Sequence, residues 1–499
     1  MELSTWLLTI LTASIGLYYY ILYKLSYFKR LKVPHERPTP LIGNMGPFIF
    51  RRMSIPENIQ RLYNLFSDAK YFGFYDFMTP TYVIRDPDLI NTIAIKQFDN
   101  FCDHRSFANE ILDPMASRNL FDLKGDHWRE MRKLLSPSFT VSKMKTMFGL
   151  MSQCAENLID FMITQSGKNG KSYDMKEILS RYANDVIATC AFGISVDSFK
   201  HPNNEFFLLG QKSKFDGWLT FVFFMQRNIP ALAKLLKLRM FGPYVENFFK
   251  NIVSNTVKIR DEQGIVRPDM IQLMMETRNK DTGPAYDINE MTAQAFVFFL
   301  AGFDATSTAM CFMAHEIGVN PDVQNKLREE IDNVLKQTNG KPTYEAINHM
   351  KYLDAVVNET LRMYPIGSFI DRRCVKEYEL PPATPDGKPI TLKPGDNIWL
   401  SHYPLHRDPK YYSQPDKFNP ERFVSGKVDN SIYMPFGIGP RMCIGNRFAL
   451  MEAKILLFYL LWHCDLLPDV KTKVPIVISK HSFTTLAEGG FWLKVRARK

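Results

Sequence analysis

A single cysteine lies within a run of glycines near the carboxyl end of this chain. Residues 436–445 read FGIGPRMCIG, which places three glycines and one proline in ten residues. That composition predicts a tight loop, and the apolar stretch 446–463 after it predicts a helix. Cys443 is therefore expected at a helix amino terminus, where the dipole and free backbone N–H groups favour a thiolate.

The residues around Cys443 suit a flat ligand that carries a carboxylate. Gly437, Gly439 and Gly445 let the backbone approach such a ligand closely, because glycine has no side chain. Arg441 can make a charge-assisted hydrogen bond to its carboxylate. A lone cysteine is usually a small buried hydrophobic residue, and this glycine and arginine frame sets Cys443 apart from that ordinary role.

Three further motifs bring charged side chains together. Residues 359–362 read ETLR, which puts a glutamate and an arginine on one helix face. Residues 420–423 read PERF, and residues 128–132 read WREMR. Each motif alone is weak evidence, since an ordinary solvated helix face often shows the same spacing. Their combination and order along the chain carry the argument.

Residues 287–319 predict one long helix. It opens with a capping box, Asp287 with Glu290 three residues later, and it ends at Asn320-Pro321. Its centre reads AGFDATS over residues 301–307, and the residues just before it are wholly apolar. An acid in such a setting is not typical of a solvated helix face, so Asp304 is a candidate functional residue.

These motifs together resemble the cytochrome P450 family, whose heme-ligand loop FxxGxRxCxG is matched completely by residues 436–445. The resemblance implies a mainly α fold with minor β, as a single large heme-containing domain behind an N-terminal transmembrane helix. It implies heme b with Cys443 as the axial thiolate ligand of the iron. The other cofactor-binding residues are then Phe436, Gly437, Arg441, Gly445, Trp128, Arg132 and Arg372. The family's structural triad falls on Glu359, Arg362 and Arg422.

The sequence departs from the family pattern at the acid–alcohol pair that delivers protons to oxygen. The acid is present as Asp304, but the next position is Ala305 rather than threonine. Thr306 follows one residue later, turned by about 100° around the helix. We expect Asp304 and Thr306, or an ordered water, to take the catalytic role with some leakage to peroxide. Gly302 is the expected site of a kink.

The resemblance implies a monooxygenase of the unspecific type that inserts one atom of O₂ into lipophilic small molecules. Xenobiotics such as insecticides or plant toxins, and endogenous lipids or hormones, stay open as substrates. The overall pattern is most similar to insect microsomal detoxifying members. The expected substrate pocket is apolar and aromatic, and its candidate residues could equally be core. They are Phe298, Phe299, Ala301, Phe303, Ala305, Ile366, Phe369 and Phe483.

The amino-terminal segment predicts a membrane anchor. Residues 3–23 carry no charge and match the hydrocarbon thickness of a bilayer, and basic residues follow directly. The positive-inside rule then puts the body on the cytosolic side, at the endoplasmic reticulum membrane. A cleaved signal peptide requires its basic residues before the apolar stretch. We therefore expect an anchor over residues 1–23, a basic and proline-rich linker over 24–47, and a catalytic domain over 48–499.

Composition and missing motifs limit the partners. The net charge of +10 allows nucleic acid, anionic lipid or an acidic protein as a partner and selects none of them. No GxGxxG nucleotide loop is present, so electrons have to come from another protein. By resemblance that partner is an NADPH-cytochrome P450 reductase, with cytochrome b5 as a second candidate and no nucleic acid. The candidate basic docking residues are Lys124, Arg129, Lys133, Lys143 and Lys145.

Two other functions remain open at the level of sequence. One is a heme-thiolate isomerase or dehydratase that acts on peroxides without a reductase, which only Ala305 supports. The other is a membrane-tethered heme protein that binds lipophilic ligands or gas without turnover. The retained Asp304 weighs against both.

Overall fold

The computed structural model describes residues 2–167, 169–213, 217–267, 269–278, 287–426 and 429–498. Within it the chain forms two compact units. Unit 1 contains residues 1–105, 368–405 and 438–440, and unit 2 contains residues 106–367, 406–437 and 441–499. Both units draw on the predicted catalytic domain.

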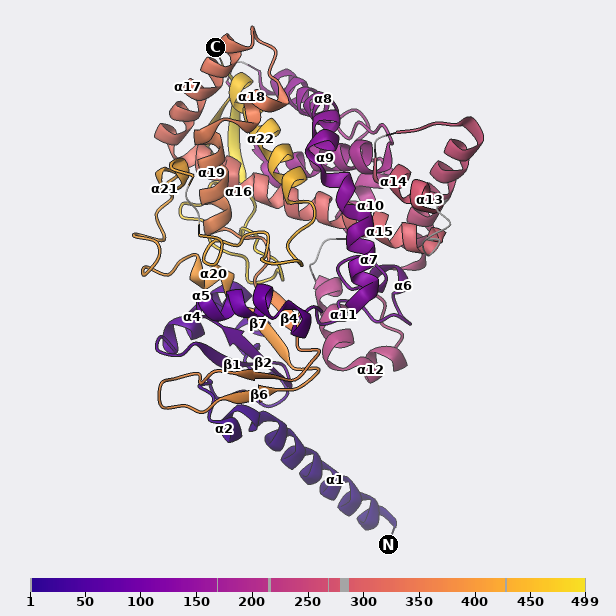
Figure 1. Ribbon diagram of the computed structural model, residues 1–499, viewed down its shortest axis with the longest axis vertical. Helices are drawn as coiled ribbons and strands as arrows, with labels where there is room; N and C mark the ends of the chain where they lie inside the picture. The colour runs from indigo at the N-terminus through magenta and orange to yellow at the C-terminus, as the bar shows by residue number, and fades with distance from the viewer. Residues whose placement is uncertain are drawn as a thin grey trace. The chain divides into compact units, whose positions relative to one another are not determined.

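The core of unit 1 is a four-stranded sheet in the order β1-β2-β7-β4 (Figure 1). The strands are β1 (Tyr71–Asp76), β2 (Thr79–Ile84), β7 (Asn397–Leu400) and β4 (Ile370–Arg373). The β1–β2 and β4–β7 pairs are antiparallel and the β2–β7 pair is parallel. Every side chain of β1 and β7 is buried, which fits their apolar and aromatic sequences. A second, two-stranded sheet joins β5 (Tyr378–Leu380) and β6 (Ile390–Leu392).

The predicted anchor forms α1 (Glu2–Leu25), a single helix that continues into α2 (Tyr27–Leu31) (Figure 1). Its segment Ser4–Leu25 is long and apolar enough to cross a membrane, and none of its apolar window is buried. The second such helix of the described chain, Ile288–Val319, is mostly buried. The first is therefore a candidate membrane span, whereas the second is a core helix of unit 2.

Contacts inside unit 1 fix the end of the anchor to the sheet. The Tyr75 hydroxyl donates to the Leu25 carbonyl oxygen over 2.7 Å. Phe28 is fully buried and packs edge-on against Tyr75 and Tyr82. A Cβ at Gly73 would lie 2.4 Å from the Phe28 ring, so glycine at this position lets the ring approach β1. The beginning of the predicted linker is thus packed rather than free.

Short helices complete unit 1. They are α3 (Gly46–Ile49), α4 (Ile55–Leu65), α5 (Pro87–Asn91), η1 (Thr92–Lys96), η2 (Phe98–Asn100) and α20 (His402–Leu405). Helix α4 opens with a capping box in which Ser54 and Glu57 bond to each other's backbone N–H groups.

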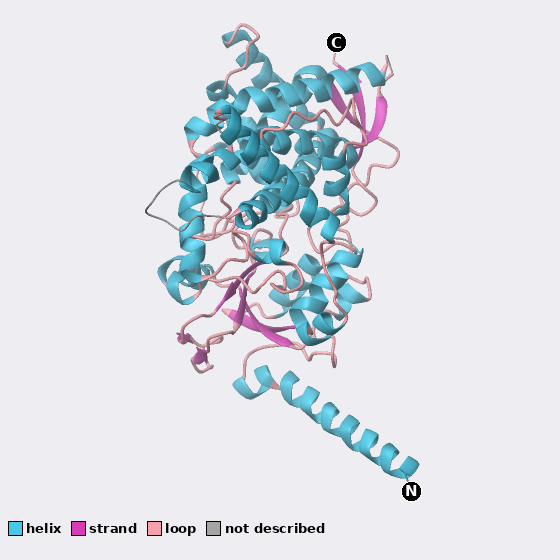
Figure 2. Ribbon diagram, turned by 90° about the vertical axis from the view of Figure 1, so that its right-hand side faces the viewer, coloured by secondary structure: helices cyan, strands magenta, loops and turns pink. Residues whose placement is uncertain are grey.

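Unit 2 is mostly helical. Helices are cyan in Figure 2, where they make up most of the chain. Its central helix consists of α15 (Ile288–Leu300), a π-helical segment η5 (Ala301–Thr306) and α16 (Ser307–Val319). The predicted capping box forms, with the Glu290 backbone N–H donating to Asp287 over 2.7 Å. The π-helical segment coincides with the predicted kink. A Cβ at Gly302 would lie 2.8 Å from Ile187, so this glycine permits a close approach of α9 (Met175–Ile187).

The remaining helices of unit 2 surround this centre. They are α6 (Pro114–Ser117), α7 (Gly125–Leu135), η3 (Ser136–Phe139), α8 (Val141–Ser166), η4 (Ala188–Phe192), α10 (Glu205–Lys212), α11 (Gly217–Asn228), α12 (Pro230–Leu235), α13 (Pro243–Gln263), α14 (Met270–Arg278), α17 (Pro321–Gln337), α18 (Tyr344–Asn348), α19 (Lys351–Met363), α21 (Glu421–Val424) and α22 (Asn446–His463). A three-stranded sheet in the order β3-β9-β8 joins β3 (Lys171–Asp174), β9 (Trp492–Ala497) and β8 (Cys464–Pro468).

Candidate functional site

The loop 436–445 is tight, as predicted, and leads into α22. Gly437 and Gly439 have φ angles of 82° and 75°, a conformation that favours glycine. The Cys443 backbone N–H donates to the Phe436 carbonyl oxygen over 2.9 Å and closes the loop. Gly445 is the N-cap of α22. Cys443 is exposed, whereas the other six cysteines are buried.

The state of Cys443 differs from the sequence expectation. Although its side chain is exposed, the surrounding protein desolvates the sulfur, and this raises the pKa of the thiol above its ordinary value. The Gly445 backbone N–H and the positive charge of Arg132 lower the pKa, but by less. The helix terminus alone therefore does not produce a thiolate. A bound metal ion would deprotonate a thiol that coordinates it.

Arg441 is held between Trp128 and backbone carbonyls. Its guanidinium lies 4.0 Å from the centre of the Trp128 ring and donates to the Leu123 carbonyl oxygen over 2.7 Å. Trp128 itself is buried in α7. On the same helix, the partly buried Arg132 forms no ion pair with any described carboxylate, and burial lowers its pKa. Arg132 is thus a cation without an anionic partner in the described protein.

Arg372 lies in β4 of unit 1 and is 1% exposed. It donates to the Asp371 and Ile438 carbonyl oxygens over 2.7 and 3.1 Å. Its Nε is buried without a partner among the described residues. Burial lowers its pKa to about 10, so the guanidinium stays charged at neutral pH. A buried cation of this kind favours an anionic ligand.

The predicted triad forms in unit 2. Glu359 and Arg362 on α19 are fully buried and make two bonds of 2.7 and 3.0 Å. Arg422 on α21 reaches the same carboxylate from its Nε over 3.3 Å. Arg362 also donates to the His406 and Pro415 carbonyl oxygens over 2.7 Å each. These extra acceptors offset the second positive charge and tie α19 to the loops before the Cys443 loop.

Asp304 lies in η5 and pairs with Lys176 of α9. The Lys176 ammonium lies 2.9 Å from the Asp304 carboxylate. It also donates to the hydroxyls of Ser307 and Thr308 over 2.8 and 2.6 Å. Thr306 is 7% exposed, and its hydroxyl has no hydrogen-bond partner among the described residues. Of the two predicted catalytic residues, Asp304 is ion-paired with Lys176, whereas the Thr306 hydroxyl is available to bond a water.

The donor set of unit 2 fits a heme. Unit 2 carries the exposed cysteine, Cys443, and one cation, Arg132, that has no carboxylate partner in the described protein. Taken by itself, unit 1 carries the buried cation Arg372, whose Nε has no partner among the described residues. A cysteine thiolate is one of the protein ligands that hold heme iron, and cations pair with the heme propionates. Glycines with positive φ in the Cys443 loop keep side chains away from that sulfur.

Comparison with known proteins decides the family. The cytochrome P450 family model matches residues 33–493. This chain belongs to the cytochrome P450 family. It is 44% identical to cytochrome P450 9e2 of Blattella germanica over 99% of this chain and 98% of that one. It is 39% identical to probable cytochrome P450 9f2 of Drosophila melanogaster, over 95% of both chains. It is 34% identical to cytochrome P450 6k1 of Blattella germanica, over 97% of this chain and 95% of that one.

The predicted substrate-pocket residues of this P450 fall into two groups on the central helix. Phe299 and Phe303 are fully buried. The Phe299 ring lies 4.8 Å from that of Phe206, and this placement favours a packing role. Phe298, Ala301 and Ala305 are instead partly or fully exposed, and their spacing places them on one face.

The other predicted pocket residues lie on loops. In unit 2 the Thr485 backbone N–H donates to the Ile366 carbonyl oxygen over 3.0 Å, which joins the two loop segments. Phe483 of the same segment packs on Phe223 of α11, with ring centres 5.0 Å apart. Phe369 belongs to unit 1, where it stacks on Trp399 at 3.8 Å.

The sequence did not reveal Lys176. It is separated from Asp304 by 128 residues, and it occupies the first turn of α9 as an ordinary charged residue. The one feature of the nearby sequence that involves Lys176 is Asp174, which caps α9 by accepting the Lys176 backbone N–H. A Lys–Asp pair formed between two helices leaves no periodic pattern in either one.

Proposed function

We propose that this P450 is a monooxygenase that oxidises lipophilic small molecules with O₂ and electrons from NADPH. The observation that supports the proposal most is the retained acid, Asp304, held by Lys176 in a π-helical segment of the central helix. π-Helical segments are frequent at functional sites. A protein that only binds ligands has no need for an ion-paired acid there.

The Cys443 sulfur would hold the iron of heme b. The bound heme, with a thiolate ligand, supplies the activation of O₂. Arg132 and Trp128 on α7, together with Arg441, are proposed to hold a propionate, and Arg372 is proposed to hold a propionate from unit 1. The Phe436, Gly437 and Gly445 backbone shapes the loop around the sulfur. The triad of Glu359, Arg362 and Arg422 keeps that loop in place.

Proton delivery is proposed to use Asp304 and Thr306. The Thr306 hydroxyl has no partner in the described protein, so it can bond and orient a water molecule. Asp304 accepts a proton at its carboxylate oxygen when it leaves Lys176. Ala305 cannot bond water through its side chain, so this chain relies on the hydroxyl one residue later. We expect part of the reducing equivalents to appear as peroxide.

The substrate is proposed to be an apolar or aromatic small molecule. Phe298, Ala301 and Ala305 present the accessible face of the central helix, and Ile366 and Phe483 add apolar loop residues in unit 2. Small side chains at 301 and 305 leave room, whereas the rings supply contact area. Insecticides, plant toxins and endogenous lipids or hormones all meet this description.

An NADPH-cytochrome P450 reductase is the proposed electron donor, with cytochrome b5 as a second partner. Among the candidate docking cations, Arg129 and Lys145 are paired with Asp126 and Glu345. Lys133 and Lys143 make no ion pair with any described residue and are the stronger candidates. Such rim charges act mainly on association rate and salt dependence.

We propose that residues 1–23 anchor the protein in the endoplasmic reticulum membrane, with residues 48–499 as the catalytic domain on the cytosolic side. The basic residues of the linker 24–47 support this orientation. A second membrane contact is proposed at α11 and α12, where Trp218, Phe221 and Leu235 are strongly exposed. Large exposed apolar side chains at one place indicate an interaction site.

The test is turnover of the full-length protein with a microsomal NADPH reductase and a panel of lipophilic compounds. NADPH consumed, peroxide released and oxygenated product are counted together. Product that requires both NADPH and O₂ supports the monooxygenase. Conversion of an organic hydroperoxide without reductase, and no NADPH-dependent product, would overturn it in favour of the isomerase. Ligand-induced spectral shifts without either turnover would indicate a binding protein.

A further inference from the structure

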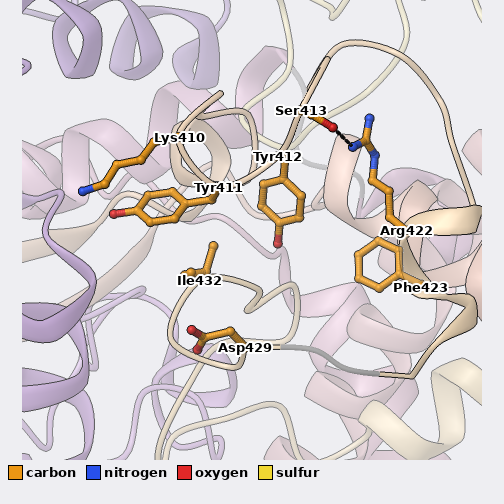
Figure 3. Close-up of a pocket in the computed structure, with 8 residues that line it drawn as sticks. All are labelled: Lys410, Tyr411, Tyr412, Ser413, Arg422, Phe423, Asp429 and Ile432. Carbon is orange, nitrogen blue, oxygen red and sulfur yellow. Dashed lines mark hydrogen bonds between the residues drawn. The ribbon is translucent and has the colours of Figure 1, made fainter.

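Unit 2 contains a cavity that the proposed reaction does not use. Its volume is about 440 Å³, and Arg422 is the one triad residue that lines it (Figure 3). Cavities of this size hold small organic ligands in other proteins. Eight residues line it, from the loop after α20, from α21 and from the segment before the Cys443 loop: Lys410, Tyr411, Tyr412, Ser413, Arg422, Phe423, Asp429 and Ile432.

Three of the lining residues present aromatic rings, and two of those rings are fixed by packing. Tyr412 packs on a buried cluster that contains Phe423 and Tyr433. The Phe423 and Tyr433 rings are 5.0 Å apart, and the Arg362 guanidinium lies 5.1 Å from the centre of the Tyr412 ring. Burial raises the pKa of Tyr412 to about 12, so its hydroxyl stays neutral. Fixed, neutral rings favour a flat apolar ligand.

Positive charge exceeds negative charge around this cavity. The Lys410 ammonium meets no carboxylate among the described residues and lies 5.2 Å from the centre of the Tyr411 ring. Arg422 shares the single carboxylate of Glu359 with Arg362, which leaves one excess positive charge behind the cavity.

The Asp429 carboxylate is engaged by close hydrogen bonds, whereas part of the Arg422 guanidinium is not. Asp429 is the one carboxylate of the lining, and it already accepts the Ser431 backbone N–H and hydroxyl over 2.9 and 2.6 Å. One N–H of Arg422 makes only a long contact of 3.4 Å to the exposed Ser413. The balance of charge in the cavity therefore favours an anion over a cation.

We propose that this cavity is a second binding site, separate from the heme, for a planar aromatic anion such as an aromatic carboxylate. The ring of the ligand packs on Tyr411 and Tyr412, and its anionic group faces the Lys410 ammonium at that end of the cavity, whereas Arg422 lies at the other end (Figure 3). Binding does not depend on the proposed monooxygenase activity.

The cavity is coupled to the Cys443 loop through Tyr433 and Met434, which directly follow the lining residue Ile432. The Tyr433 hydroxyl donates to the Asn358 carbonyl oxygen over 3.0 Å, on the helix that carries Glu359 and Arg362. The next residue, Met434, donates its backbone N–H to His406 over 3.0 Å. Phe436 begins the Cys443 loop two residues later. A ligand that orders Tyr433 and Met434 stabilises the Cys443 loop. Ligand binding therefore raises the unfolding temperature of the holoenzyme.

The test uses the full-length, heme-loaded protein in lipid nanodiscs with its iron saturated by imidazole, which keeps the probe from the iron. The probe is 2-naphthoate, and its neutral analogue is naphthalene-2-carboxamide. Calorimetric titration is expected to show naphthoate binding at least about tenfold tighter than the amide. Naphthoate is also expected to raise the unfolding temperature.

Matched variants locate the site. Lys410→Glu and Tyr411→Ala are each expected to weaken naphthoate binding about tenfold or more. Lys417→Glu changes the same charge on the same loop outside the cavity, and it is expected to bind as the unchanged protein does. Heme content is measured for all three to check folding. No binding of naphthoate, equal binding by the Lys410→Glu and Lys417→Glu variants, or equal affinity for the amide overturns the proposal.

Discussion

The Lys176 ammonium lies 2.9 Å from the Asp304 carboxylate, and the two side chains are only 12% and 20% exposed. The same ammonium donates to Ser307 and Thr308, so four acceptor atoms on the central helix hold one cation. A partly buried pair of this kind is better fixed than a surface ion pair. Lys176 therefore acts as a positioning residue for Asp304.

Replacing Lys176 with methionine is expected to leave Asp304 without its fixed partner. Product formation should fall about tenfold or more, and the fraction of NADPH recovered as peroxide should rise, because the proton reaches oxygen less reliably. The measurement is NADPH, product and peroxide in one assay, repeated across pH. Lys171→Met removes an exposed lysine from β3 and serves as the control. An unchanged product-to-peroxide ratio and pH profile in the Lys176→Met protein would contradict the positioning role.

Gly439 tests whether the shape of the Cys443 loop depends on a missing side chain. An alanine Cβ at this position would lie 2.1 Å from the Ala94 carbonyl oxygen, and the φ of 75° adds strain. Gly439→Ala is expected to yield little heme-loaded protein, as measured by heme content and the carbon monoxide difference spectrum. Gly426 has a similar φ of 69° and open space around its Cβ position. Gly426→Ala should cost only about 1–2 kcal/mol and keep its heme; equal loss in both variants would refute the steric account.

The triad makes a second test of the same loop. Glu359→Gln leaves Arg362 buried with no carboxylate, which is expected to cost about 3–5 kcal/mol of stability. The measured results are a lower unfolding temperature and lower heme content. Glu421→Gln breaks a solvent-exposed pair with Lys326 and is expected to leave the unfolding temperature and heme content nearly unchanged. If both substitutions lower heme content equally, the buried triad does not support the loop.

The sequence predicted the helices well where their local signals were strong. The bounds of α22 coincide with the predicted stretch 446–463, and α15, η5 and α16 together fill the predicted stretch 287–319 from Ile288 onward, because apolar sequence and clear ends agree there. Strand β1 has no clear sequence signal, although its six residues are all buried. Its sequence YFGFYD contains a glycine and does not alternate, so it carries no period-two pattern.

The site was predictable where a motif is local and not where contacts are distant. The Cys443 loop and the Glu359–Arg362 pair lie within short segments, so spacing alone places their residues. Lys176 reaches Asp304 through the packing of two helices, which no local pattern reports. The thiol of Cys443 was expected to have a favoured thiolate, but desolvation outweighs the helix terminus and raises its pKa. Burial of a site is a property of the whole fold and not of its motif.

Glu452 on α22 provides a prediction about pH. The side chain is 1% exposed, and neither of its carboxylate oxygens has a hydrogen-bond partner in the described protein. Cys154, Tyr182 and Cys190 face it electrostatically from α8, α9 and η4. Among the described residues no cation acts on this carboxyl, so burial raises the pKa of Glu452 well above its ordinary value. Asp185 on α9, whose pKa is raised to about 6, adds a second buried acid on that helix.

The raised pKa of Glu452 makes the folded protein less stable as pH rises. The folded protein keeps the proton on Glu452 at pH values where the unfolded chain has lost it, so folding becomes less favourable as pH rises above about 4.3. Glu452→Gln removes this dependence. Its free energy of unfolding should exceed that of the unchanged protein by an amount that grows by up to about 1.4 kcal/mol per pH unit until the folded carboxyl ionises. Urea unfolding between pH 5 and pH 8, about the range where most proteins are stable, measures it. Glu329 is exposed, so the Glu329→Gln control should show the same pH dependence of the free energy of unfolding as the unchanged protein. The same pH dependence in Glu452→Gln would mean that the buried carboxyl is already ionised, and it would contradict the prediction.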